Sequence, residues 1–187
     1  MQTLTRAGLL RRGAAAALAA SGAGALAGSA LGDVPPDADL AQARLLVAAE
    51  LLADDFYTQA LAAGLLAAAP LHEARANERA HYAALAAILN AAGQPPATAA
   101  DIDFSYPAGA FATPASVTRL GIAVESLQVG AYLGAAAVLA SEPLRGIAAR
   151  IGANEAQHLT IFQPFHSSFP VALSIEQASD ALGAYTS

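Results

Sequence analysis

The chain contains one six-residue pattern twice, Ala-Asn-Glu-x-x-His at residues 76–81 and again at residues 153–158. Polar residues are scarce in this chain, because 56% of its residues are hydrophobic, 13% are charged and only four are histidine. Two matches with the same Ala-Asn in front are therefore not expected by chance. The repeat predicts that the chain folds as two similar halves.

The similarity between the halves begins upstream of this pattern. Glu50 and Glu125 each stand in an apolar run, and each is followed seven residues later by a tyrosine, Tyr57 or Tyr132. The separation between these two glutamates is nearly the same as the separation between the two Glu-x-x-His motifs. Because the pattern occurs only twice, it indicates one duplicated pair of helices rather than a solenoid of many repeats.

The high content of Ala and Leu predicts helices, and Pro and Gly mark where they begin and end. We expect helices at residues 40–69, 71–92, 114–140 and 142–162, and a short fifth helix from residue 174. Asp37 or Asp39 is predicted to cap the first helix, Thr113 the third and Ser174 the fifth. No alternating strand pattern occurs, so the predicted fold class is all-α.

The links between the predicted helices differ in length. The first link and the third are short, so the helices that they join form antiparallel hairpins. Residues 93–112 form a link long enough to cross from one end of a bundle to the other. The predicted architecture is a four-helix bundle with one long crossover between its second and third helices and a short C-terminal fifth helix.

Helical spacing brings the acidic and imidazole side chains of the repeat together. Residues three apart lie on one face of a helix, so each Glu-x-x-His motif presents its two side chains side by side. Four carboxylates in a bundle core, with two neutral imidazoles, carry a charge of about −4, which two divalent metal ions would cancel. Carboxylate and imidazole ligands suit Fe or Mn. The candidate metal ligands are Glu50, Glu78, His81, Glu125, Glu155 and His158.

These six residues resemble the complete ligand set of the ferritin-like dimetal-carboxylate superfamily, and the resemblance covers about residues 37–165. It implies that Glu78 and Glu155 bridge two metal ions, that Glu50 and Glu125 are terminal ligands, and that each histidine binds one ion. With its leader, the chain is also similar to exported bacterial ferritin-like domain proteins related to desiccation-associated proteins. The alternative is a pair of surface helices on which Glu and His are neighbours without binding a metal.

Further polar residues lie beside the candidate ligands. Tyr57 and Tyr132 are tentative catalytic residues, expected either to hydrogen-bond a site carboxylate or to relay electrons, and the alternative is that they are ordinary buried aromatics. Asp54 lies four residues after Glu50, and we weigh an extra ligand role against exposure to solvent. Asn77 and Asn154 precede the two bridging glutamates and are expected to hydrogen-bond across the bundle.

Residues 1–32 differ in composition from the rest, residues 33–187, which form the predicted domain. Three arginines precede an uncharged Ala- and Gly-rich stretch, as in an export signal, and the context resembles a twin-arginine signal. We expect export to the periplasm, the cell wall or the medium. The alternative is an uncleaved leader that anchors the domain to the membrane from outside, which would be the chain's only membrane contact.

Composition and site together limit the function. A net charge of −6 and a pI near 5.0 exclude a nucleic-acid-binding footprint. We expect an exported metal-binding protein whose dinuclear Fe or Mn centre performs redox chemistry with O2 or peroxide, as a ferroxidase, peroxidase or catalase-like enzyme. The alternative is a stress-protective structural protein that binds metal without turnover. An iron-storage cage is the less favoured third reading, and a homodimer is one allowed assembly.

Overall fold

The computed structural model describes residues 34–163 and 170–186. The predicted leader lies outside the described residues, so export stays a prediction. In the described part every element is helical, and the one β-bridge joins Phe104 to Thr186. The helices are α3 (Asp37–Ala63), α4 (Ala68–Ala91), α5 (Pro114–Val138), α6 (Glu142–Phe162) and α7 (Ile175–Leu182), with a short 3-10 helix η1 (Ala99–Asp101).

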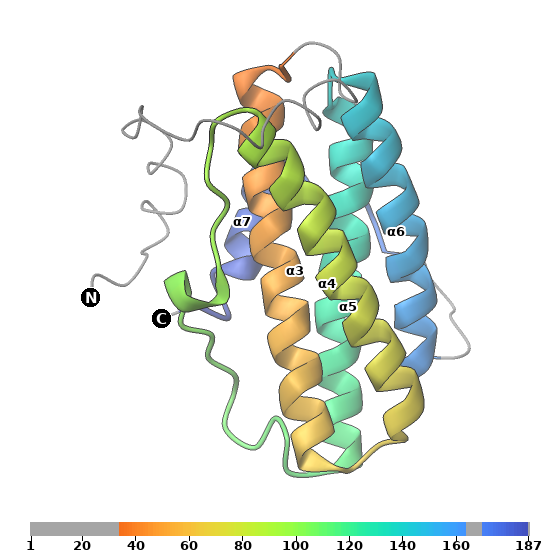
Figure 1. Cartoon of the computed structure of the whole chain (residues 1–187). Coiled ribbons are helices and arrows are strands. Elements are labelled where there is room, and N and C mark those ends of the chain that lie inside the picture. Colours follow the sequence, from red (N-terminus) through yellow and green to blue (C-terminus); the bar gives the residue numbers. More distant parts are fainter. Residues whose placement is uncertain (1–33, 164–169, 187) are drawn as a thin grey trace.

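Helices α3 to α6 form a four-helix bundle of two antiparallel hairpins joined by one long crossover, which confirms the predicted fold class (Figure 1). The hairpin partners α3 and α4 pack along their length, and so do α5 and α6. The link between α4 and α5 runs along the outside of α3 from one end of the bundle to the other (Figure 1). The short helix α7 packs against α3 and α5, where it covers the back of the bundle.

The local signals at three helix ends act as the sequence predicts. Thr113 accepts a hydrogen bond from the backbone N–H of Ser116 and is followed by Pro114 at N1. Ser174 and Gln177 form the predicted capping box of α7. Pro70 marks the start of α4, although the helix begins at Ala68 rather than at residue 71, and in the first turn its missing N–H costs nothing.

Two expectations about α3 are wrong. Neither aspartate caps it, because the N-cap residue is Pro36 and no side chain caps this end. The buried carboxylate of Asp39 instead accepts hydrogen bonds from the backbone N–H groups of Ala140 and Ser141, in the link between α5 and α6. The helix also ends at Ala63 rather than at residue 69, because Gly64 adopts the left-handed conformation (φ 65°) that terminates helices.

The apolar core has two parts, one on each side of a polar layer. One cluster contains Leu45, Leu85 and Ile151, and the other contains Phe56 and Phe162. Fully buried glutamates lie between these clusters on all four long helices. Helix α5 is long and apolar enough to cross a membrane, with a mean hydropathy of 1.3 in its most apolar window, but 56% of that window is buried inside the protein. Its place in this core accounts for its composition.

Residues 170–174 form a strap that crosses the outer side of α5. The backbone N–H of Leu173 donates a hydrogen bond to the carbonyl of Gly130, 2.9 Å away. A Cβ atom on Gly134 would lie 1.8 Å from the carbonyl oxygen of Leu173, so only glycine permits this close approach. The glycines of α5 therefore let the chain after α6 pack directly against the helix backbone.

Candidate metal centre

The six candidate ligands converge in the polar layer between the two apolar clusters. Helices α3 and α5 supply one glutamate each, and α4 and α6 supply one Glu-x-x-His motif each. The ligand atoms form two groups, and within each group all atoms lie within 4.8 Å of one another. One group consists of Glu50, Glu78, His81 and Glu155, and the other of Glu78, Glu125, Glu155 and His158. Glu78 and Glu155 belong to both groups, so they join the two halves.

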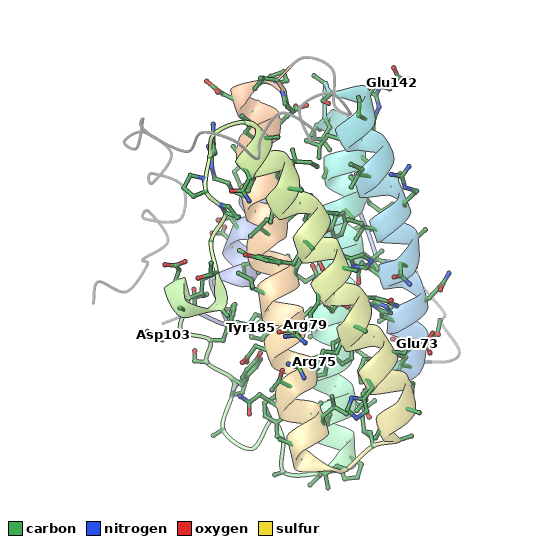
Figure 2. All side chains as sticks on the ribbon, in the orientation of Figure 1. Glu73, Arg75, Arg79, Asp103, Glu142 and Tyr185 are labelled. Carbon is green, nitrogen blue, oxygen red and sulfur yellow. The ribbon has the colours of Figure 1, made fainter. Side chains whose placement is uncertain are left out.

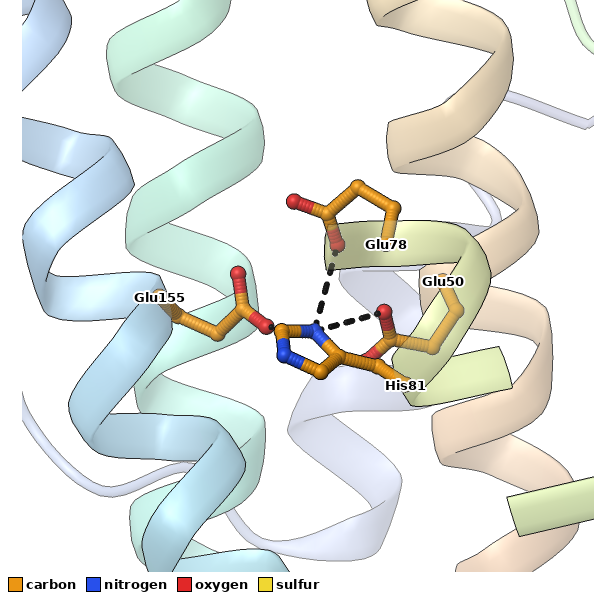
Figure 3. Close-up of side chains that lie close together, drawn as sticks. All are labelled: Glu50, Glu78, His81 and Glu155. Atoms are coloured by element: carbon orange, nitrogen blue, oxygen red, sulfur yellow. Dashed lines mark ion pairs between the residues drawn. The ribbon is translucent and has the colours of Figure 1, made fainter. Parts of the chain in front are cut away.

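The first group is centred on Nδ1 of His81 (Figure 3). This atom lies 2.7 Å from Oε1 of Glu155, 3.4 Å from Oε2 of Glu50 and 3.7 Å from Oε2 of Glu78. Despite these distances, Nδ1 makes no hydrogen bond of acceptable geometry. The polar atoms of all four side chains thus lie close together around one point.

The second group repeats this arrangement around His158. Its Nδ1 lies 2.8 Å from Oε1 of Glu78, 3.0 Å from Oε2 of Glu155 and 4.0 Å from Oε2 of Glu125. The nearest carboxylate to each imidazole belongs to the opposite Glu-x-x-His motif, since His81 lies closest to Glu155 and His158 closest to Glu78. The pseudo-symmetry of the sequence is therefore preserved in the geometry.

Burying four carboxylates costs free energy unless a cation balances their charge. All four glutamates are completely buried. Eight buried side-chain N and O atoms lack a hydrogen-bond partner among the described residues, and six of them belong to the cluster: five carboxylate oxygens and Nδ1 of His81. Native proteins leave few buried polar groups unsatisfied, and buried carboxylates are usually paired or bound to metal. The cluster fits a metal site for two reasons: its donor atoms are carboxylate oxygens and imidazole nitrogens, and six of these atoms lack a hydrogen-bond partner among the described residues.

The pKa values of the acidic groups reflect the same crowding. Burial and the charge of Glu155 raise the pKa of Glu50 well above its ordinary value. Burial and the charge of Glu78 raise the pKa of Glu125 in the same way. Burial acts in the same direction on Glu78, but the nearby imidazoles of His158 and His81 outweigh it and lower its pKa.

For the two imidazoles, burial and the neighbouring carboxylates shift the pKa in opposing directions. Burial lowers their pKa values, but the surrounding carboxylates outweigh it, with Glu155 contributing most. The result is a pKa of about 12 for His81 and about 10 for His158. Without a metal ion, protons would therefore neutralise the cluster, whereas a cation would displace them.

Each tyrosine of the repeat hydrogen-bonds a glutamate on the opposite helix. Tyr57 of α3 donates to Oε1 of Glu125 on α5, and Tyr132 of α5 donates to Oε1 of Glu50 on α3. Burial and the charge of the acceptor glutamate raise the pKa values of both tyrosines, so both hydroxyls keep their protons. Of the roles expected for Tyr57 and Tyr132, the structure shows the hydrogen bond to a site carboxylate.

The two asparagines are not equivalent. The side-chain Nδ2 of Asn77 lies 3.2 Å from Nε2 of His158, across the bundle. An asparagine can present its N–H2 group or its oxygen, so this contact suits either protonation form of the imidazole. The side chain of Asn154 makes no such contact among the described residues.

Asp54 lies outside the cluster. Its Oδ1 is 2.9 Å from Nε of Arg75 and 3.8 Å from Nε of Arg79, and its side chain is 26% exposed. Both arginines belong to α4 and are labelled in Figure 2. Asp54 therefore forms a surface ion pair, and the structure gives it no place among the candidate ligands.

Gln128, a buried polar residue beside the cluster, is not among the residues predicted from the sequence. Gln128 is fully buried on α5, and its Nε2 donates to the carbonyl of Ala49, 3.0 Å away. A glutamine in the mostly apolar run after Glu125 was the available signal.

The fold and the cluster define the class of protein: a helical bundle of two hairpins around a buried carboxylate and imidazole cluster that can hold metal. The sequence model of the ferritin-like domain family matches residues 37–166, which contain all six candidate ligands. The chain belongs to the ferritin-like domain family. A comparison with curated proteins gives no match.

Proposed function

We propose that the chain is a redox protein that binds two Fe or Mn ions and reacts with O2 or peroxide. The observation that carries the proposal is that Glu78 and Glu155 each belong to both groups of candidate ligand atoms. A carboxylate has two oxygens, so a glutamate shared between two groups can bridge two ions. Two divalent ions would also balance the four buried carboxylates.

In this proposal each half of the cluster holds one ion. Glu50 and His81 complete one coordination set, and Glu125 and His158 complete the other. Oxygen and imidazole donors suit Fe and Mn, and the described residues contain no cysteine or methionine that would offer a soft ligand. Bound as a pair, such ions exchange electrons with O2 or peroxide.

The chain's own residues hold this chemistry in place. Tyr57 and Tyr132 fix the rotamers of Glu125 and Glu50 through their hydrogen bonds, which leaves the second oxygen of each carboxylate directed to an ion. The apolar clusters on both sides of the layer exclude water, which strengthens every charge interaction within it. Metal binding requires neutral imidazoles, so both histidines release a proton when an ion is bound.

A second candidate function is supported by the unsatisfied carboxylate oxygens. An ion that binds only the folded chain stabilises it by mass action, without any turnover. In that case the cluster would be a structural centre of a stress-protective protein. This candidate differs from the first in its reaction with oxidant and not in its ligands.

The reaction with oxidant separates the two candidates. The full chain is stripped with a chelator, loaded anaerobically with Fe(II) or Mn(II), and mixed with O2 or hydrogen peroxide. The redox function predicts consumption of oxidant by the loaded protein beyond that of free metal, and its loss in a Glu78→Ala/Glu155→Ala double variant. Stoichiometric metal binding without consumption of either oxidant would contradict the redox function and leave the structural candidate.

A further inference from the structure

Gln128 is a buried side chain with one end fixed and the other end without a partner. Its side chain is fully buried, and its Nε2 donates to the carbonyl of Ala49. Its Oε1 has no hydrogen-bond partner among the described residues. The amide cannot turn over, because its oxygen would then face the carbonyl oxygen of Ala49. Gln128 is therefore fixed as an acceptor.

The position of Gln128 on α5 places it beside the candidate metal centre. It lies three residues after Glu125 and four before Tyr132, so the three residues share one face of the helix. Glu125 belongs to the cluster, and Tyr132 donates its hydrogen bond to Glu50. Ala49, which binds the Gln128 amide, directly precedes Glu50 in α3. Gln128 thus packs at the Glu50 half of the cluster.

The other half has no counterpart of this amide. In the sequence repeat, Gln128 corresponds to Ala53, as Glu125 corresponds to Glu50. An alanine offers no acceptor to the Glu125 half, so Gln128 breaks the pseudo-symmetry of the site.

The two histidines differ in accessibility as well. The His158 side chain is 4% exposed, is contacted by Asn77 and meets the ring of Tyr57 edge-on at 6.3 Å. The His81 side chain is 12% exposed. The half that contains the free acceptor is therefore also the half that is more open to small molecules.

We propose that Oε1 of Gln128 accepts a hydrogen bond from an O–H group of a small ligand, water or a peroxide, bound at the Glu50 and His81 half of the centre. This inference rests on the proposed metal site. A fixed acceptor stabilises a ligand that carries a proton and repels an anion that does not. Gln128 would then act as a positioning residue that makes this half selective for protonated oxygen ligands.

Azide binding to the Co(II)-loaded full chain tests this role, because azide is an anion without an O–H group. Co(II) makes binding visible in the optical spectrum and avoids dependence on turnover. We expect azide to bind about three- to tenfold more tightly to Gln128→Leu than to the wild type, the ratio that corresponds to one hydrogen bond. The Co(II) content should stay unchanged. Gln128→Met, which is closer in length, should give the same shift.

The control is Gln42→Leu, which removes another buried glutamine about two turns before Glu50 on α3. It should leave azide affinity at the wild-type value, because its loss affects packing alone. Azide affinity within twofold of wild type in both Gln128 variants, at normal Co(II) content, would overturn this inference alone. Loss of Co(II) from both variants would also overturn it, by making Gln128 a ligand or a structural support. Failure of the wild type to bind Co(II) would overturn the proposed metal site itself.

Discussion

Tyr132 on α5 donates its hydroxyl hydrogen bond to Glu50 on α3, and not to a group on its own helix. Tyr57 on α3 makes the mirror contact with Glu125 on α5. The two bonds cross the bundle in opposite directions and join its two halves at the polar layer. Gly152 on α6 allows this packing, since a Cβ atom there would lie 2.9 Å from Cβ of Tyr132. The duplicated hairpins are thus interlocked by their own repeated residues.

Replacing either tyrosine by phenylalanine should destabilise the protein without removing its metal. Each change leaves one more buried carboxylate oxygen without a donor, which costs about 1–3 kcal/mol in the free energy of unfolding. Urea denaturation of the stripped full chain measures this cost for Tyr57→Phe and Tyr132→Phe. Tyr106→Phe is a control, because that hydroxyl bonds Asp55 outside the cluster, at 2.9 Å. Stability equal to wild type in both site variants would mean that the crossed hydrogen bonds contribute nothing.

The stability of the stripped protein should fall as the pH rises from about 5 to 9. The folded pKa values of Glu50 and Glu125 are raised above the ordinary 4.5, and those of His81 and His158 are raised above 6.5. The folded state therefore binds more protons than the unfolded state in this window, and its stability decreases with pH. The lowered pKa of Glu78 affects the free energy of unfolding only below about pH 4.5, so it does not change the dependence on pH within this window.

Metal should reverse this trend, because bound ions replace the protons. Thermal unfolding at several pH values, with chelator and with added Fe(II) or Mn(II), compares the two states under anaerobic conditions. In the presence of metal we expect the stabilisation by the ion to grow as the pH rises. A stripped protein that becomes more stable between pH 5 and pH 9 would contradict the protonation states assigned to the cluster.

Gly134→Ala should destabilise the strap after α6. The new Cβ would lie 1.8 Å from a backbone carbonyl oxygen, which cannot move aside as a flexible side chain could. We expect a loss of about 1–3 kcal/mol in the free energy of unfolding, as for overpacked cores. Gly146→Ala on α6 is the matched control: its Cβ would meet only the end of Arg150, at 4.0 Å. That control should stabilise the helix by about 0.5–1 kcal/mol. Equal effects of the two changes would contradict the packing of the strap.

The sequence predicted the helical fold because its signals are local. Thr113 and Ser174 cap the helices that directly follow them, so neighbouring residues suffice to identify them. Asp39 has the residue type of a cap, but its partners Ala140 and Ser141 lie about a hundred positions away. Such a partner cannot be read from residues near Asp39. The end of α3 at Gly64 was readable, because a glycine in the left-handed conformation is a common helix terminator.

In the candidate site too, contacts within one helix could be predicted from the sequence, and contacts between helices could not. Helical spacing placed Glu78 beside His81 and Glu155 beside His158, and the structure brings these pairs together. Spacing along one helix could not show that each tyrosine bonds the glutamate of the other hairpin. It also could not show that Asn77 reaches His158 while Asn154 has no such contact. These relations depend on how the two hairpins are packed together.

The proposed bridging of two metal ions by Glu78 and Glu155 is tested most directly by metal analysis of the purified full chain. Wild type should contain about two ions of Fe or Mn per chain, and the Glu78→Ala/Glu155→Ala variant almost none, because both coordination sets share these carboxylates. Glu73→Ala, an exposed glutamate on the same helix as Glu78, should retain the wild-type content (Figure 2). Equal metal content in the wild type and the double variant would contradict the site.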